Sequence, residues 1–160
     1  MIYSATTEYA LRALAHMATL PGGTRILARD LAEETVIPRQ FLGKILHRLT
    51  KDGFLNSAKG RGGGFRFSRS PRAITVADIV TAVEGVQSEQ KCVLGLNECT
   101  DLQPCPMHDQ WVIFRSALVE RIYAMTIMDL GTNLKAKRQL AQRLVAPQVG
   151  PFPPTHHPGS

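Results

Sequence analysis

Hydrophobic positions in this chain recur mostly at three- and four-residue intervals, which is the spacing of helices that bury one face. The clearest early example is the series Tyr9, Leu11, Leu14 and Met17, which ends before Pro21. Two short apolar runs without this period flank a glycine-rich tip and predict a pair of strands. In chain order, the predicted elements are helices over 6–19, 27–34 and 38–52, strands over 54–58 and 64–68, and helices over 75–83, 109–128 and 135–144. The predicted fold class is therefore mainly α with a small β-hairpin.

The order of elements in the first half is that of a winged helix-turn-helix domain, whose second helix enters the DNA major groove. Pro38 suits the first turn of that helix and Gly53 its end. Its inward face is predicted to carry Phe41, Leu42, Ile45, Leu46 and Leu49. The tip between the strands, residues 59–63, has the sequence Lys-Gly-Arg-Gly-Gly. It lacks the spacing of a phosphate-binding loop and is not followed by a helix, so we interpret it as the wing of a domain spanning 1–85.

Positive charge is concentrated in this helix and wing. The chain has a formal net charge of +6. Between Pro38 and Arg72 there are nine Lys or Arg residues and one acid, Asp52, so this segment is +8 and the remainder −2. Such a local excess predicts a polyanion partner, most simply a double-stranded DNA operator. The candidate DNA contacts are Arg39, Gln40, Lys44 and Arg48 on the helix, and Lys59 and Arg61 on the wing.

All three cysteines of the chain lie in one short segment together with a histidine. Cys92, Cys99, Cys105 and His108 follow the spacing C-x6-C-x5-C-x2-H. Thiolates and imidazole bind zinc, copper or iron–sulfur clusters, and the Gly, Asn, Asp and Pro residues between them favour an irregular loop. We expect residues 86–108 to form such a loop. The odd number of cysteines argues against a fully paired disulfide framework.

Three functional classes remain open for this segment. The first is a DNA-binding regulator that senses its signal through an iron–sulfur cluster. The second is a DNA-binding regulator whose loop binds zinc or oxidises its thiols without a cluster. The third is an enzyme with a Cys–His nucleophile and base, which is the weakest because no pocket-building motif is present and a basic wing has no role in it. We therefore expect a protein that is not an enzyme.

The helix predicted over 109–128 is too apolar for a small monomer to cover. Its apolar positions are Trp111, Phe114, Leu118, Ile122 and Met125, widened by Val112, Ile113, Val119 and Ile127. We expect it to pair with the same helix of a second copy, in a dimerisation region spanning 109–145. Residues 146–160 contain five prolines and no charged residue, which predicts a disordered tail. No apolar run approaches about 18 residues and no signal-peptide pattern is present, so we expect a cytoplasmic protein without a membrane partner.

Several segments together resemble the bacterial IscR/NsrR-type regulators over roughly residues 1–135. They are SATTEYALRAL, DLAEETVIPRQFLGKILHRLTKDGFL, the wing KGRGGGF, and ITVADIVTAVEG followed by the three cysteines. The resemblance implies a homodimeric winged-helix transcription factor. It also implies sensing of iron–sulfur status, nitric oxide or redox state through a bound cluster.

The same resemblance implies the cluster ligands. IscR-like members hold a 2Fe–2S cluster with three cysteines and a histidine placed as His108 is, so 2Fe–2S is favoured here. NsrR-like members hold a 4Fe–4S cluster with an acid from the first helix of the other subunit, and Glu8 stands at that position. Two departures stand out: the first cysteine interval has six residues instead of five, and Gly43 replaces an acidic residue that discriminates operators in IscR-like proteins. Operator rules therefore do not transfer.

Overall fold

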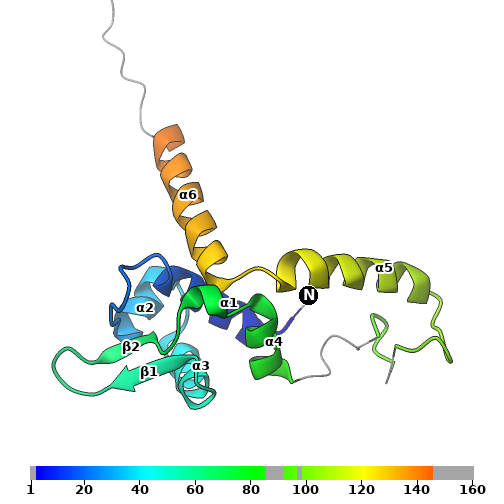
Figure 1. Ribbon diagram of the computed structural model, residues 1–160, viewed down its shortest axis with the longest axis horizontal. Helices are drawn as coiled ribbons and strands as arrows, with labels where there is room; N and C mark the ends of the chain where they lie inside the picture. The colour runs from blue at the N-terminus through cyan, green and yellow to red at the C-terminus, as the bar shows by residue number, and fades with distance from the viewer. Residues whose placement is uncertain (1–2, 86–91, 97–98, 146–160) are drawn as a thin grey trace, which may run out of the picture.

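The computed structural model describes residues 3–85, 92–96 and 99–145 (Figure 1). The predicted class, mainly α with one hairpin, is confirmed. The elements are α1 (Ala5–Met17), α2 (Ala28–Thr35), α3 (Arg39–Lys51), β1 (Leu55–Ala58), β2 (Gly64–Phe67), a 3₁₀ turn η1 (Pro71–Ala73), α4 (Val76–Glu84), α5 (His108–Leu118), a π-helical turn η3 (Val119–Tyr123) and α6 (Ile127–Val145). The tail predicted over 146–160 lies outside the described residues. None of the helices among the described residues is long and apolar enough to cross a membrane.

Helices α1 to α4 enclose one hydrophobic core beneath the hairpin. The fully buried side chains at its centre are Leu14, Leu31, Leu42, Leu46, Leu49, Leu55, Ile74, Ile79 and Val80. Burial of each such side chain contributes roughly 1.5–3 kcal/mol, so the apolar stripe of α3 fixes which of its faces points outward. Two polar contacts join the ends of the domain: the Glu84 carboxylate accepts hydrogen bonds from the Ser4 backbone N–H (2.6 Å) and the Thr7 hydroxyl (2.8 Å).

The hairpin is an antiparallel pair whose register runs from Leu55 opposite Phe67 to Ala58 opposite Gly64. Ile26 extends this sheet, because it exchanges two backbone hydrogen bonds with Phe65 at 3.0 and 2.9 Å. Gly64 lies where these segments meet, and a Cβ there would come within 2.5 Å of the Ile26 carbonyl oxygen. Glycine is therefore required at the base of the wing.

The prediction of one continuous helix over 109–128 is wrong, because the helix is interrupted at residues 124–126. The chain leaves helix after Tyr123 and starts α6 at Ile127. Thr126 and Asp129 cap α6 reciprocally, since the Thr126 N–H donates to the Asp129 carboxylate (2.9 Å) and the Asp129 N–H donates to the Thr126 hydroxyl oxygen (3.1 Å). The pattern Thr-x-x-Asp is a helix-start signal in the sequence, but the apolar spacing continues across it and therefore predicted one uninterrupted helix.

Backbone pairing with the start of α4 also breaks the predicted helix. The Val76 N–H donates to the Met125 carbonyl oxygen, and the Ile127 N–H donates to that of Ile74, both at 2.8 Å. These bonds hold Thr126 in an isolated antiparallel bridge opposite Thr75, immediately before α4. Two separate helices, α5 and α6, result.

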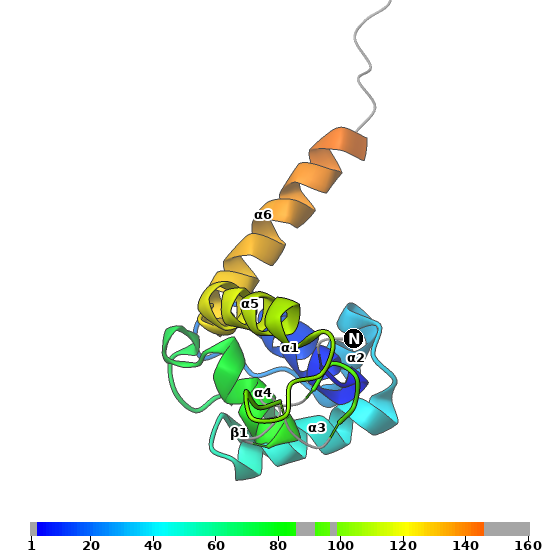
Figure 2. The same cartoon turned by 90° about the vertical axis from the view of Figure 1, so that its right-hand side faces the viewer.

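Helix α6 is correspondingly longer than the helix predicted over 135–144. Gly131, which lies between the two helices predicted over 109–128 and 135–144, is inside α6. A Cβ at Gly131 would lie 2.7 Å from the Ala18 Cβ and 3.1 Å from the Ala15 carbonyl oxygen. This glycine therefore permits α6 to approach α1 closely. Figure 2 shows α6 rising from the domain on the side away from α3.

Phe41 was predicted to face inward, and this is wrong, because its side chain is 50% exposed. The other four predicted inward residues of α3 are buried. Phe41 lies in the first turn, one position before the buried stripe that starts at Leu42, and the core does not reach it. It joins the polar side chains on the outer face of the helix.

Candidate DNA-binding surface and cysteine site

The outer face of α3 carries the candidate DNA contacts of the helix. Arg39, Gln40, Lys44 and Arg48 are all exposed. Arg48 forms an ion pair within the helix, since its Nε lies 3.8 Å from the carboxylate of Asp52, one turn later. An exposed pair of this kind contributes well under about 1 kcal/mol, so Arg48 remains available to a phosphate. The face as a whole is cationic and open to solvent.

The wing presents the other two cations. Lys59 and Arg61 are exposed at the tip of the hairpin, which extends away from the helical body (Figure 1). Gly60 and Gly62, on either side of Arg61, have φ angles of 83° and 75°, a conformation that other residues rarely adopt. The tip is therefore shaped by its glycines, and Arg61 projects from it.

The sequence did not indicate that two arginines near the base of the wing, Arg25 and Arg69, have contacts within the domain itself. Arg25 donates from Nη1 to the Gly64 carbonyl oxygen at 3.1 Å, which ties the segment before α2 to β2. Arg69, one of the nine cations of the basic segment, lies over the Phe54 ring at 5.0 Å from its centroid. The charge of Arg69 therefore interacts with an aromatic ring of the domain itself. No sequence signal distinguishes these two arginines from the candidate DNA contacts.

The structure brings the three thiols and the imidazole together as a series of neighbours. Cys92 is buried, whereas Cys99 and Cys105 are partly exposed. The Cys92 and Cys105 thiols are close enough for each to change the pKa of the other. The Cys99 Sγ lies 3.4 Å from the His108 Nδ1 at the start of α5. The four donors thus fall into two neighbouring pairs.

The two thiols of the first pair have different pKa shifts. Backbone N–H groups of Leu94, Leu96 and Gly95 point at the Cys92 sulfur and, led by that of Leu94, they lower its pKa against the opposing effect of burial. The Met107 N–H acts in the same direction on Cys105, but burial and the neighbouring Cys92 outweigh it and the Cys105 pKa is raised. Of these two thiols, Cys92 therefore loses its proton at the lower pH.

His108 has a carboxylate neighbour that the sequence did not reveal. The Asp101 Oδ1 lies 2.8 Å from the His108 Nε2. The side chain of His108 is 8% exposed and that of Asp101 is 98% exposed, so the acid approaches the buried ring from the solvent side. Asp101 is two residues after Cys99, and nothing in the sequence identifies it as the partner of His108.

Glu8 is not part of this arrangement within one chain. It lies half-buried in the first turn of α1. Within the described residues it has no hydrogen bond or ion pair with the cysteines or with His108. A role for Glu8 would require the cysteine site of a second copy.

The donor set has the number and the type of ligands that a 2Fe–2S cluster uses. Among the described residues, no three Cys, His, Asp and Glu side chains are grouped so as to hold one metal ion. A 2Fe–2S cluster instead needs two terminal ligands on each of two irons. The pairs Cys92–Cys105 and Cys99–His108 match that number and type of ligand.

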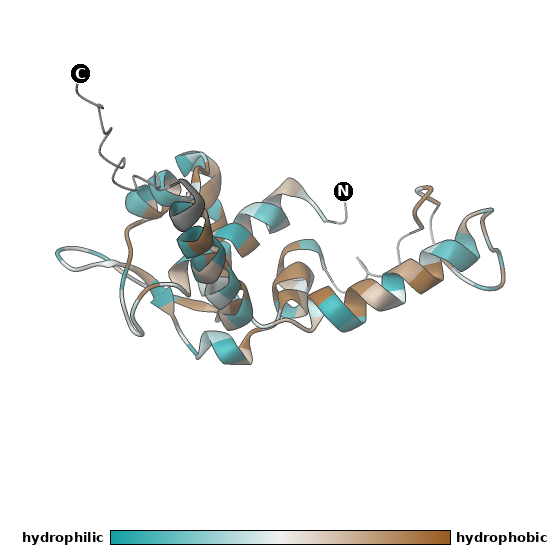
Figure 3. Ribbon diagram, turned by 90° about the horizontal axis from the view of Figure 1, so that it is seen from above, coloured by the Kyte–Doolittle hydropathy of each residue, from teal (hydrophilic) through white to brown (hydrophobic). Residues whose placement is uncertain are grey.

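An apolar surface follows the cysteine site along α5 and η3. Ile113 is 66% exposed and Phe114 51% exposed, and Val119 and Ile122 continue the surface at helical spacing. Trp111 stacks on Phe114 with ring centroids 5.7 Å apart. Figure 3 shows hydrophobic residues along α5, which projects from the body of the domain. Only Leu118 and Tyr123 of this segment are buried against the core.

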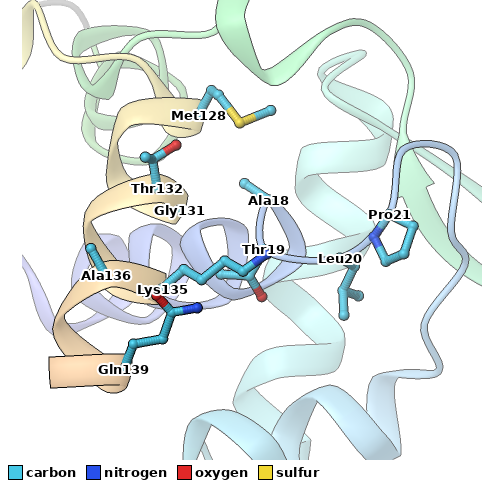
Figure 4. A pocket seen from close by; sticks show the side chains of 10 residues that line it. All are labelled: Ala18, Thr19, Leu20, Pro21, Met128, Gly131, Thr132, Lys135, Ala136 and Gln139. Atoms are coloured by element: carbon cyan, nitrogen blue, oxygen red, sulfur yellow. The ribbon is translucent and has the colours of Figure 1, made fainter. Parts of the chain in front are cut away.

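A separate pocket lies between the C-terminal end of α1 and α6 (Figure 4). Thr19 and Leu20 line one side of it, and Met128, Lys135 and Gln139 the other. None of the candidate site residues lines it. Gly131 also lines it, and it is not part of the candidate site.

A helix-turn-helix with an exposed basic α3 and a glycine-rich basic wing defines a DNA-binding transcriptional regulator. More narrowly, the chain belongs to the Rrf2 family: the family model for Rrf2, described as an iron-dependent transcriptional regulator, matches residues 3–133. The family is one of transcriptional regulators, which confirms that the protein is not an enzyme.

Individual relatives agree with this assignment. An HTH-type transcriptional regulator of Aquifex aeolicus (strain VF5) is 35% identical over 139 residues, or 86% of this chain and 95% of the relative. The structure of CymR, the global cysteine regulator of B. subtilis, has a TM-score of 0.67 at 23% identity and covers 81% of this chain and 95% of its own. The structure of T. potens IscR has a TM-score of 0.64 at 20% identity and covers 84% of this chain and 89% of its own. At such identities the two structures confirm the fold alone.

Proposed function

We propose that this regulator senses redox state, nitric oxide or iron–sulfur status through an iron–sulfur cluster held by Cys92, Cys99 and Cys105. The observation that carries the proposal is the convergence of all three thiols of the chain with His108 in two neighbouring pairs. A 2Fe–2S cluster is favoured. When bound, the cluster supplies a centre that changes charge or falls apart on reaction with an oxidant or nitric oxide.

The chain's own residues prepare this site in three ways. The backbone N–H groups around Cys92 stabilise its thiolate, the form that binds a metal. His108 is held among the thiols at the first residue of α5. The partly exposed Cys99 and Cys105 leave the site within reach of a small oxidant.

A thiol switch without a cluster is the second candidate function, with zinc binding as its variant. The neighbouring Cys92 and Cys105 thiols favour the switch, because a lowered thiol pKa beside a second thiol is the arrangement that forms a disulfide on oxidation. This step forms one S–S bond and transfers two electrons and two protons to the oxidant. In this alternative Cys99 and His108 have no direct role.

We further propose that the protein acts as a homodimer on a roughly palindromic operator. The exposed apolar surface of α5 and η3 would be covered by the same surface of a second copy. Two symmetric α3 helices and wings would then read two half-sites. In this dimer Glu8 of one copy would approach the cysteine site of the other, which makes it a candidate fourth ligand for a 4Fe–4S cluster. Such a regulator would work in the cytoplasm.

Anaerobic purification tests the cluster directly. We expect coloured protein with visible absorption, bound iron and acid-labile sulfide. The visible absorption, the iron and the sulfide should all be lost when any one of the three cysteines is replaced, in Cys92→Ala, Cys99→Ala or Cys105→Ala. The control variant Thr100→Ala, in the same segment, should retain all of them. Colourless wild-type protein with stoichiometric zinc would support the zinc variant, and colourless metal-free protein that forms a Cys92–Cys105 disulfide would support the switch.

A further inference from the structure

The contact between Asp101 and His108 determines where the imidazole carries its proton. The Asp101 carboxylate lies 2.8 Å from Nε2 and, as a carboxylate, can only accept a hydrogen bond. Nε2 must therefore be the nitrogen that bears hydrogen. In a neutral imidazole the other nitrogen, Nδ1, then has the free lone pair.

That second nitrogen is the one that faces the thiols. Nδ1 lies 3.4 Å from the Cys99 Sγ, within the distance at which an S–H group donates to it. The ring itself is buried, and the two contacts hold its two nitrogens on opposite sides. The other tautomer would place the Nε2 lone pair against a carboxylate oxygen, so the Asp101 contact favours the form with hydrogen on Nε2.

We propose that Asp101 is a positioning residue that fixes the Nε2–H tautomer of His108 and thereby presents Nδ1 as the ligand atom beside Cys99. The ligand assignment rests on the proposed function, but the tautomer does not. Histidines that bind metals commonly donate their second N–H to a carboxylate, which raises the basicity of the ligating nitrogen. Asp101 supplies this carboxylate from the solvent side of the site.

The cluster-free protein gives the first test. In ¹⁵N-histidine-labelled protein, long-range ¹H–¹⁵N correlation spectra distinguish the two tautomers, and His108→Gln identifies the signals of residue 108. We expect the Nε2–H form in the wild type and a shift toward the Nδ1–H form in Asp101→Asn and Asp101→Ala. Asp109→Asn, next to His108 on the first turn of α5, removes a carboxylate without touching the ring contact and should leave the spectrum unchanged. A wild-type spectrum dominated by Nδ1–H, or one that Asp101→Asn leaves unaltered, overturns the role of Asp101.

The cluster-loaded protein gives the second test. Loss of the carboxylate should weaken electron donation from His108, so the reduction potential of the cluster should become more positive in Asp101→Asn and return toward the wild-type value in Asp101→Glu. Hyperfine coupling of the reduced cluster to Nδ1 of ¹⁵N-labelled His108 would identify the ligand atom. Coupling to Nε2, or an unchanged potential, overturns the ligand assignment. Failure of the proposed function is separate: it would appear as wild-type protein without a cluster, while the tautomer test still decides the role of Asp101.

Discussion

Arg138 on α6 lies against His16 in the last turn of α1, with Nη1 3.4 Å from the imidazole Nδ1. His16 is buried, and burial is the main cause that lowers its pKa below 6.5. The Arg138 charge lowers this pKa further, and Glu34 opposes it in part. The contact between the two helices thus contains a histidine that resists protonation.

The first prediction is a loss of stability on acidification. Because the folded pKa of His16 is lowered, the unfolded chain binds a proton more readily than the folded chain. The free energy of unfolding should therefore fall as the pH drops below about 6.5, with a slope from this residue of at most about 1.4 kcal/mol per pH unit. Urea unfolding at about pH 7.5 and about pH 5.5 measures it. His16→Gln should reduce the difference in the free energy of unfolding between these two pH values, whereas His47→Gln, on the exposed face of α3, should leave that difference unchanged. A difference as large in His16→Gln as in the wild type would contradict the prediction.

The second prediction concerns the two glycines inside long helices. Gly131→Ala should destabilise the protein by about 1–3 kcal/mol, because the new methyl group would overlap Ala18. Gly43→Ala is the matched control: it lies inside α3 with no atom within 4 Å of a new Cβ, and it should stabilise by about 0.5–1 kcal/mol. Thermal or urea unfolding compares them. Equal effects of the two substitutions would mean that α6 does not pack closely on α1.

The third prediction places the wing on DNA. Arg61→Ala should weaken operator binding and, if Arg61 contacts a phosphate, reduce the salt slope of log K by about 1. Lys135→Ala removes the same charge from α6, which extends away from α3 and the hairpin (Figure 1), and it should change binding little. Fluorescence anisotropy over a salt series provides both quantities. A wild-type slope and affinity in Arg61→Ala would exclude the wing from the interface.

The fourth prediction concerns self-association. Ile113→Asp places a charge in the middle of the exposed apolar surface and should shift the protein from dimer to monomer in analytical ultracentrifugation. Leu27→Asp is the control, since Leu27 is also an exposed apolar residue but lies at the start of α2. A wild-type protein that sediments as a monomer would show that the surface has another role.

Periodicity predicted the winged domain well because each of its helices buries one face against one core. The stripe of Leu42, Ile45, Leu46 and Leu49 leaves a single choice for the orientation of α3. The same rule failed at the junction of α5 and α6, where the apolar spacing continues through residues 124–126. There the backbone bonds to Ile74 and Val76, which are distant in sequence, decide the structure.

The cysteine site was predictable in its donors but not in its supporting contacts. Thiols are rare enough in this chain for their spacing to be informative. An aspartate in a polar segment is not, and nothing in the sequence distinguishes Asp101 from Asp109 as the partner of His108. The distinction arises only when the segment before α5 is folded and one of the two carboxylates comes to lie beside the ring.

The backbone bonds at Met125 and Ile127 join the chain after η3 to the start of α4. The stretch that contains the cysteine segment, α5 and η3 therefore leaves α4 at its C-terminal end and returns to its N-terminal end. Because the chain after η3 is bonded to the start of α4, a displacement of α5 that followed a change at the thiols would be transmitted to the winged domain. In a symmetric pair, such a displacement would change the separation of the two wings.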